Sequence, residues 1–341
     1  MTKKIDRRSF LKCVAVSAAA MGLGGCGTAD AAASTAASGS AASGSGTWAP
    51  AGNIDVIVAY KAGSGTDNTT RVLTTYAEKY VGQTLVVQNV EGASGALGWA
   101  QLSGSDPDGM TIGLVNLPTL CSNISEGLAD YTMEDFLPIC NHVTETAVVL
   151  VAGNSPYNKL EELVAAAKEK PGELQASTNG AKASNHIGAQ LLAHSAGFEY
   201  NAVPYGGTAD QLLALRQGEV DFSVAKPADF ISFASEVKIL GVFNNERLEN
   251  YPDVPTLGEL GYYDQWYGSA RCLVAPKGTP QNVIDFYAEA FKATMEDTEY
   301  LAAAAAASME TDYRNPEQTA ELLASQDKFC EETLPELFPE G

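Results

Sequence analysis

The feature that most constrains the fold of this chain is a regular alternation of short apolar runs with amphipathic stretches. Runs of five or six residues rich in Val, Ile and Leu are typical of buried strands, at 54–58, 85–90, 111–115, 146–151, 174–178, 220–224 and 238–242. Between several of them lie helical stripes, such as Val72, Leu73, Tyr76 and Tyr80. The alternation predicts an α/β protein with mixed, mostly parallel sheets flanked by helices.

Glycine-rich loops follow two of the predicted strands, where ligands of such sheets bind. The first contains Tyr60 and Gly63-Ser64-Gly65-Thr66-Asp67, and the second contains Gly92-Ala93-Ser94-Gly95. Glycine lets the backbone approach a ligand, and a helix N-terminus supplies free N–H groups with a partial positive charge. We expect Asp67 to cap its helix rather than to touch an anion. Together the loops predict a site for a small organic anion. The Lys-Ser/Thr ending of a Walker motif is missing, which disfavours ATP.

The first 50 residues predict export. Arg7-Arg8 precede an apolar stretch from Cys13 to Leu23, which is shorter than the roughly 20 residues that span a bilayer. This pattern is typical of a signal peptide of the twin-arginine type, over residues 1–25. Residues 23–26 resemble a lipobox, in which Cys26 would carry the lipid; the alternative is an ordinary signal with an incidental cysteine. Residues 26–49, rich in Ala, Ser and Gly, are predicted to be a flexible tether.

The charge excludes one class of partner. The chain has 21 basic and 42 acidic residues, and without the five basic and one acidic residue of 1–25 the net charge is 16 − 41, or about −25. Nucleic acid is therefore an unsuitable partner. An anion site in such a chain must depend on short-range hydrogen bonds. The cysteines lack metal-ligand spacing, so neither a metal nor a cofactor is predicted, and disulfide pairs cannot be assigned from the sequence.

Further motifs carry a resemblance to a known family. They occur in this order: Gly63–Asp67, Val86-Val-Gln-Asn-Val-Glu-Gly-Ala-Ser-Gly95, Asp106-Pro-Asp-Gly-Met-Thr-Ile112, Asp135-Phe-Leu-Pro-Ile139, Val203-Pro-Tyr-Gly-Gly-Thr208, Asp253-Val-Pro-Thr-Leu-Gly-Glu259 and Ala275-Pro-Lys-Gly-Thr-Pro280. In order and spacing, from about Ile54 to the C-terminus, the chain resembles the substrate-binding proteins of tripartite tricarboxylate transporters, the TctC or Bug family. The resemblance implies a two-domain periplasmic-binding-protein fold of type II that closes on a carboxylate, and delivery to a large and a small membrane subunit.

The resemblance also implies binding residues in the second domain. A loop there carries Thr178, Asn179, Ser184 and His186, and the Pro-Tyr motif places Tyr205 and Gly206 at the cleft. Lys226 stands where the family often has a short polar residue; it either pairs with a second ligand carboxylate or lies solvated at a domain rim. For His186 we prefer helix capping or donation to a ligand over a catalytic triad, because no Gly-x-Ser-x-Gly elbow occurs.

The strand pattern and the resemblance together predict the domain limits. Strand 148–151 should leave the first domain and strand 270–274 should return to it, which gives 50–151 with 271–341 as domain 1 and 152–270 as domain 2. The predicted function is an exported, lipid-anchored solute receptor, facing the periplasm or the cell exterior, that is not an enzyme. A receptor that feeds a membrane signalling protein and, less favoured, an exported hydrolase stay open as alternatives.

Overall fold

The structure is a computed structural model that describes residues 48–128 and 130–339. These described residues belong to one compact unit. The predicted export signal, the lipobox with Cys26 and nearly all of the predicted tether lie outside the described residues. Within the described part of the chain, no helix is both long and apolar enough to cross a membrane.

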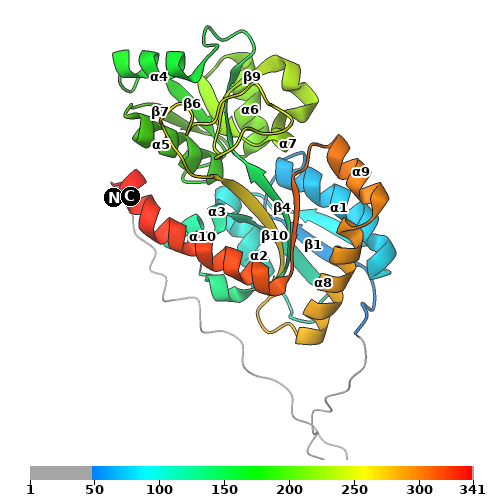
Figure 1. Ribbon diagram of the computed structural model, residues 1–341. Helices are drawn as coiled ribbons and strands as arrows, with labels where there is room; N and C mark the ends of the chain where they lie inside the picture. Colours follow the sequence, from blue (N-terminus) through cyan, green and yellow to red (C-terminus); the bar gives the residue numbers. More distant parts are fainter. Residues whose placement is uncertain (1–47, 129, 340–341) are drawn as a thin grey trace, which may run out of the picture. The chain divides into compact units, whose positions relative to one another are not determined.

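A six-stranded sheet forms one half of this unit (Figure 1). In spatial order its strands are β11 (Thr311–Arg314), β4 (Phe136–Thr146), β10 (Gly268–Pro276), β3 (Thr111–Leu117), β1 (Ile54–Val58) and β2 (Leu85–Asn89). Strand β1 pairs in parallel with both β2 and β3, so the carboxyl ends of these three strands lie at one edge of the sheet. Strand β10 runs antiparallel to both of its neighbours, β3 and β4.

A five-stranded sheet forms the other half. Its spatial order is β7 (Asn201–Pro204), β6 (Gln175–Thr178), β8 (Phe222–Ala225), β5 (Val148–Ala152) and β9 (Val237–Val242). Strand β6 is parallel to β7 and β8, whereas β5 is antiparallel to β8 and β9. The carboxyl end of β6 therefore presents its loop beside that of β7.

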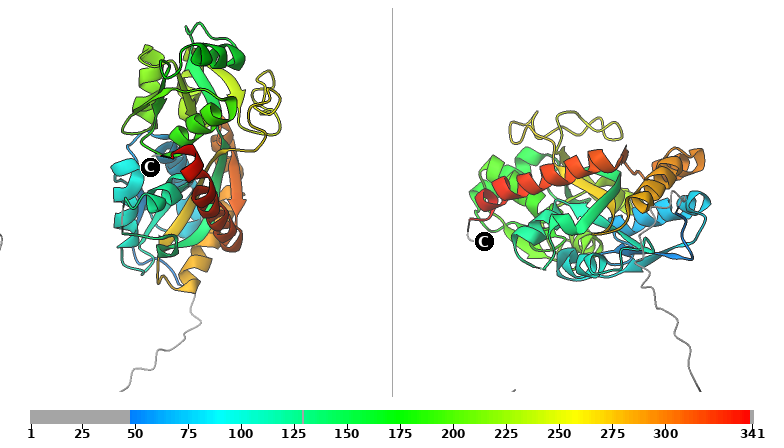
Figure 2. Two further views of the ribbon diagram at one scale, coloured as in Figure 1. Left: turned by 90° about the vertical axis from the view of Figure 1, so that its left-hand side faces the viewer. Right: turned by 90° about the horizontal axis from the view of Figure 1, so that it is seen from below.

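Helices follow most strands and cover the sheets (Figure 1). Those of the six-stranded half are α1 (Gly65–Val81), α2 (Ala96–Ser103), α3 (Thr119–Ser125), α8 (Gln281–Met295), α9 (Thr298–Ala306) and α10 (Pro316–Leu337). Those of the five-stranded half are α4 (Leu160–Glu169), α5 (Ser184–Ala196), α6 (Thr208–Gln217) and α7 (Pro227–Phe230). Short 3₁₀ turns lie at Ala93–Gly95, Met133–Asp135 and Ile231–Glu236. The long C-terminal helix α10 packs on β4 and α3 and also contacts α5 (Figure 2).

The sequences Thr208-Ala-Asp-Gln211 and Asn315-Pro-Glu-Gln318 both have the spacing that predicts a capping box, and the two have different outcomes in the structure. At α10, Asn315 accepts the backbone N–H of Gln318 and the Gln318 side chain accepts that of Asn315, as predicted. At α6 the prediction of a box from Thr208 to Gln211 is wrong, because the N-cap is Gly207. The buried Gln211 amide instead donates to the backbone oxygen of Val224 at 2.8 Å. Because the Gln211 side chain is bound to the sheet, it is not available to form a capping box.

The predicted α/β, two-sheet fold class is confirmed, with one difference in detail. Each sheet is mixed, and antiparallel pairing is more extensive than expected. The reason is that β10 runs antiparallel to both of its neighbours in one sheet, and β5 runs antiparallel to both of its neighbours in the other. All seven predicted runs contain strand residues, although run 146–151 spans the end of β4 and most of β5. Strand β4 was not predicted along its length, because Pro138 and polar residues such as Asn141 interrupt its apolar pattern.

The chain passes between the sheets at one narrow place. Ala147 separates β4 from β5; its N–H donates to the Tyr267 carbonyl and its carbonyl accepts the N–H of Phe243, both at 3.0 Å. The N–H of Tyr267 donates to the Phe243 carbonyl, also at 3.0 Å. Three backbone segments thus bind one another where the outgoing and returning chains meet. The predicted domain limits agree in position with this crossing but stay a prediction.

Candidate functional site

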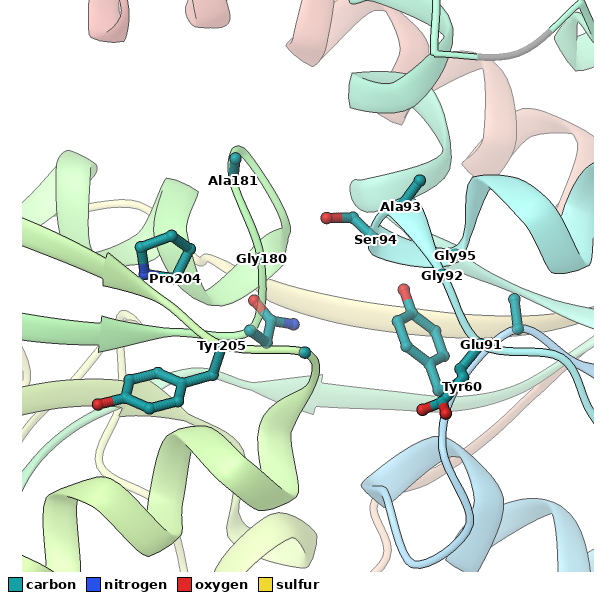
Figure 3. Close-up of a pocket in the computed structure, with 13 residues that line it drawn as sticks. Tyr60, Glu91, Gly92, Ala93, Ser94, Gly95, Gly180, Ala181, Pro204 and Tyr205 are labelled. Carbon is teal, nitrogen blue, oxygen red and sulfur yellow. The ribbon is translucent and has the colours of Figure 1, made fainter.

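A cavity of about 380 Å³ lies where loops of the two sheets face each other (Figure 3). The six-stranded half contributes Ala59, Tyr60 and the loop 91–95, and the five-stranded half contributes 179–181 and 204–206. Each of these segments follows a strand that runs toward the cavity: β1, β2, β6 and β7. The volume falls within the range of roughly 300–1,000 Å³ that is usual for small-molecule sites.

The first loop is held by its own hydrogen bonds. Ser64 is the N-cap of α1 and accepts the N–H of Asp67 at 3.2 Å. The Asp67 carboxylate accepts the N–H of Gly63 at 2.8 Å and binds Arg71 and Asn89. Burial would raise the pKa of Asp67, but these hydrogen bonds outweigh it and lower the pKa below its usual value. Asp67 therefore stabilises the start of α1, while the first-turn N–H groups of Gly65 and Thr66 stay without intrahelical acceptors.

The second loop has an unusual backbone. Ala93 and Ser94 have positive φ angles of 46° and 53°, and Gly95 follows at 97°. Non-glycine residues in this region cost about 1–2 kcal/mol each, so the conformation persists only because its surroundings impose it. The loop turns its backbone and the Ser94 hydroxyl toward the other sheet (Figure 3). A Cβ at Gly180 would lie 2.3 Å from the Ser94 oxygen, so the two loops meet at a position that only glycine fits.

The opposite wall comes from the loops after β6 and β7. Asn179 lines the cavity, and its side-chain oxygen accepts the N–H of Asn185 at 3.1 Å, in the first turn of α5. The Thr178 hydroxyl donates to the Gly180 carbonyl at 3.3 Å and thereby stabilises the loop after β6. The ring of Tyr205 points away from the cavity (Figure 3), and its hydroxyl donates to Glu219 at 3.4 Å. Tyr205 contributes mainly backbone to the wall.

A second, polar chamber of about 20 Å³ adjoins the cavity and shares Tyr60 and Asn179 with it. Its other lining residues are Ser64, Gly65, Thr66, Asn116, Ser184, Thr208, Lys226, Asp229, Ser269 and Arg271. The space is enough for about one water molecule. The side-chain oxygen of Asn116 is buried here and has no hydrogen-bond partner among the described residues, while its amide donates to Thr66 at 2.7 Å. The Asn116 side-chain oxygen is thus a hydrogen-bond acceptor that a molecule in the chamber could use.

Lys226 is one of two cations in this chamber. It is 2% exposed, and its ammonium donates to the Ser184 hydroxyl at 2.8 Å and to the Asn185 side-chain oxygen at 2.5 Å. Burial lowers the pKa of Lys226 to about 8, while the Asp229 carboxylate partly opposes this shift. The expectation of a lysine solvated at a domain rim is therefore wrong, because the side chain is enclosed. Contact with a ligand stays a prediction.

Arg271 is the second cation and was not predicted. Its guanidinium is 3% exposed, binds the buried Glu145 carboxylate and lies 3.9 Å from Asp229. Burial lowers the pKa of Arg271 to about 10, which leaves it charged at neutral pH. The sequence carried a signal for this cluster: a single arginine within the apolar strand 268–276 and a single glutamate just before the apolar strand 148–152. A buried charge within a strand requires a partner nearby.

His186 faces away from both spaces. Its Nδ1 accepts the backbone N–H of Lys182 at 2.9 Å, and its ring packs on Phe338 with centroids 5.0 Å apart. Burial, with a smaller effect of Lys182, lowers the pKa of His186 to about 4, so the ring is neutral at pH 7. The imidazole thus binds the loop just before the N-cap residue Ala183 of α5, and this geometry gives no support to ligand contact.

The structure brings most of the predicted site residues together. Those that line the cavity are Tyr60, Ala93, Ser94, Gly95, Asn179, Tyr205 and Gly206. Those that line the adjoining chamber include Ser64, Gly65, Thr66, Ser184 and Lys226. Gly63, Asp67, Thr178 and His186 line neither space and act within the loops themselves. Asn116, Asp229, Ser269 and Arg271 belong to the chamber and were missed. No group of three or more potential metal ligands occurs among the described residues.

A cavity between loops of two α/β sheets, joined where β4 meets β5 and where the chain returns to β10, is the arrangement of a periplasmic solute-binding protein. The chain belongs to the tripartite tricarboxylate transporter receptor family (TctC), whose family model matches residues 69–334. This family and the structural neighbours are solute-binding proteins, not enzymes. The resemblance found in the sequence motifs is thereby confirmed.

Individual relatives agree with this assignment. The "UPF0065 protein in gbd 5'region" of Cupriavidus necator is 32% identical over 277 residues, which cover 81% of this chain and 84% of that protein. The crystal structure of a TctC solute-binding protein from Polaromonas, without ligand, is 29% identical with a TM-score of 0.63, over 82% of this chain and 96% of that one. MatC from Rhodopseudomonas palustris, with bound malate, has the same fold at 24% identity and a TM-score of 0.76, over 82% of this chain and 97% of that chain.

Proposed function

We propose that this protein is an exported receptor that captures a small organic carboxylate in the cavity and delivers it to a tripartite tricarboxylate-type transporter. The observation that carries the proposal is the position of two glycine-rich loops at two adjoining spaces: residues 92–95 line the cavity, residues 64–66 line the chamber, and both spaces share Tyr60 and Asn179. The malate seen in MatC supports the same ligand class.

The chemistry of the walls favours an anion over a sugar or a cation. The left-handed backbone of the loop 92–95 brings its peptide groups close to the cavity, and the adjoining chamber is lined by Gly65 and Thr66, first-turn residues of α1 whose N–H groups have no intrahelical acceptor. Its only charged lining residue among those described is Glu91, which is exposed. A carboxylate bound between the loops 63–66 and 92–95 would be stabilised by short-range hydrogen bonds from these loops, despite the acidic surface of the protein.

A ligand with a second acidic group has a further partner available. Lys226 lies behind Asn179 in the adjoining chamber, where its charge is little screened by solvent. Dicarboxylates are therefore the preferred candidates within the carboxylate class. Since Asp229 and Glu145 balance Lys226 and Arg271, the chamber is near neutrality and attracts the ligand only at contact distance.

The location and partners are part of the same proposal. The export signal and a lipid at Cys26 would hold the receptor at the membrane, facing the periplasm or the cell exterior. The large and small subunits of the transporter would accept the ligand from it.

A thermal-shift screen tests the ligand class. The purified protein is heated with malate, succinate, adipate, citrate and benzoate, and with the neutral amide of each acid at the same concentration. A true ligand at about 100 times its dissociation constant adds roughly 2.7 kcal/mol to the free energy of unfolding, which is several degrees in Tm for a protein of this size. At least one acid should raise Tm while its amide does not. Shifts caused only by sugars or cations would refute the proposal.

A further inference from the structure

Four cysteines lie in the described part of the chain, and all are buried: Cys121, Cys140, Cys272 and Cys330. The proposed function uses none of them. An exported protein meets oxidising conditions in which disulfides form and persist. Their placement in the fold decides which pairs could be joined.

Cys121 and Cys330 are neighbours although 209 positions separate them. Cys121 lies on α3 and Cys330 on α10, two helices that pack against each other, and each cysteine is 1% exposed. The Cys330 thiol also donates to the carbonyl of Pro118, the N-cap of α3, at 3.6 Å. Both side chains belong to one apolar cluster with Leu120 and Leu334. Both buried thiols thus lie where α3 and α10 pack against each other, and the nearby Cys330 thiol is the main cause of the raised pKa of the Cys121 thiol.

The other two cysteines have no such arrangement. Cys140 and Cys272 lie on the adjacent strands β4 and β10, but Cys272 is paired with Asn141 and Cys140 with Leu273. Neighbouring residues of a strand point to opposite faces of the sheet. The two side chains accordingly belong to different apolar clusters, on either side of the sheet. The Cys272 thiol is bonded to the side chain of Asn141 at 3.3 Å.

We propose that Cys121 and Cys330 form a disulfide in the exported protein, which ties the C-terminal helix α10 to α3. The two thiols release two protons and two electrons, and a disulfide oxidant outside the cytoplasm accepts them and is reduced to two thiols. Because both sulfur atoms are buried, the exchange takes place before α10 docks or when it opens transiently. The proposal goes beyond the carboxylate receptor function and depends only on export.

The link would act on a helix that touches the site. Thr119 of α3 accepts the backbone N–H of Ser184 at 3.0 Å, and Ser122 donates to the Lys182 carbonyl at 2.8 Å. At its other end α10 reaches the five-stranded half, where the Leu337 carbonyl accepts the amide of Gln190 at 2.9 Å. A disulfide between α3 and α10 would hold together two elements that each contact α5 or the loop before it.

The test is mass spectrometry of the full chain collected after export. Cells are lysed in a thiol-blocking alkylating agent, and the protein is denatured, alkylated and digested without reductant. We expect the peptides that contain Cys121 and Cys330 to be joined, two mass units below their sum, and Cys140 and Cys272 to be alkylated. A second arm refolds the protein from urea with oxidised and reduced glutathione, which removes any dependence on the host's oxidant.

Variants and stability give independent readouts. Cys330→Ser should free Cys121 for alkylation, whereas the matched control Cys140→Ser should leave the link intact. Reductant should lower the Tm of the wild-type protein by about 5–10 °C, since the link closes a long loop, and should leave the Tm of Cys330→Ser unchanged. Four free thiols in both arms, or a link between any other pair, would overturn the proposal.

Discussion

At the scale of single residues, the charge of Lys226 is the most informative property of the site. Its pKa of about 8 in the folded protein lies below the 10.5 of a free lysine, because burial disfavours the ammonium form. Between these two pH values the unfolded chain binds more protons than the folded one. The contribution of Lys226 to the free energy of unfolding therefore rises with pH across that window.

The same titration predicts a pH dependence of ligand binding. If the Lys226 ammonium pairs with a second carboxylate, affinity for a dicarboxylate should fall as pH rises through about 8, by at most about tenfold per unit. Isothermal titration between pH 7 and 9 measures this, below the pH where Arg271 would titrate. Lys226→Met should bind more weakly at pH 7 and show a flat profile.

Lys61→Met is the matched control for this experiment. Lys61 is half exposed and pairs with Asp210 at 3.3 Å, so it carries a charge near the same loop without entering either space. An exposed pair of this kind contributes little to stability, and its removal should preserve the wild-type profile. If the affinity of the wild-type protein for a dicarboxylate did not change between pH 7 and 9, Lys226 would have no role in ligand recognition.

At the scale of elements, the close approach of two loops controls access to the cavity. Gly180 has a φ of 132°, and an added Cβ would lie 2.3 Å from the Ser94 oxygen. Gly180→Ala should therefore displace the Ser94 hydroxyl from its position and crowd the approach of the loop after β6 to the loop after β2. We expect the affinity for the best acid of the thermal-shift screen to fall about tenfold or more, which corresponds to about 1.4 kcal/mol of binding free energy.

The control must separate backbone strain from steric contact. Gly172 also has a positive φ, of 74°, but a Cβ there meets no atom within 4 Å. Gly172→Ala and Gly180→Ala should each lose about 1–2 kcal/mol of stability, whereas only Gly180→Ala should lose affinity. Equal affinities in the two variants, measured by titration at a temperature where both are folded, would contradict a role for the Ser94–Gly180 approach.

The structure gives Gly65 a second role, besides the ligand contact that the sequence predicts. A Cβ at this position would lie 2.0 Å from an oxygen of Asp229 and 3.0 Å from the Arg271 guanidinium. Gly65 thus belongs to the contact between α1 and the buried charges, in addition to any contact with a ligand. A bulky substitution would disturb both, so it is a weaker test of binding than Gly180→Ala.

At the scale of the whole molecule, the contacts across the cavity indicate a closed arrangement. Lys182 pairs with Glu126 at 2.7 Å, and the Thr119 hydroxyl accepts the backbone N–H of Ser184 at 3.0 Å. The only strand crossings among the described residues meet at Ala147, Phe243 and Tyr267, where few dihedral changes would suffice to separate the halves. A ligand that contacts both halves would favour the closed form by its differential affinity.

Closure can be measured in solution. Small-angle X-ray scattering of the protein with a saturating amount of its best acid should give a smaller radius of gyration than without it. In Gly180→Ala, where the added methyl group crowds Ser94, the same amount of acid should produce a smaller decrease. An identical radius with and without ligand in the wild-type protein would show that binding does not depend on this hinge.

Sequence patterns alone predict the fold class and the general position of the site. Apolar periodicity reports burial directly, so every predicted run contains strand residues, and glycine-rich loops after strands identified the segments around the cavity. The residues missed in the chamber have a common cause. Asp229 and Arg271 lie far apart along the chain, on α7 and β10. A lone arginine in an apolar strand indicates that Arg271 needs a partner, but no local pattern identifies Asp229 or the buried Glu145 as that partner.

The directions of individual side chains, in contrast, follow from the tertiary structure. It enclosed Lys226 and turned His186 toward the backbone of its own helix start. It also placed Cys121 against Cys330 while separating Cys140 from Cys272 by the thickness of a sheet. The physical reason is that the direction of a side chain depends on sheet register and on packing between distant elements, whereas composition and periodicity describe each segment alone.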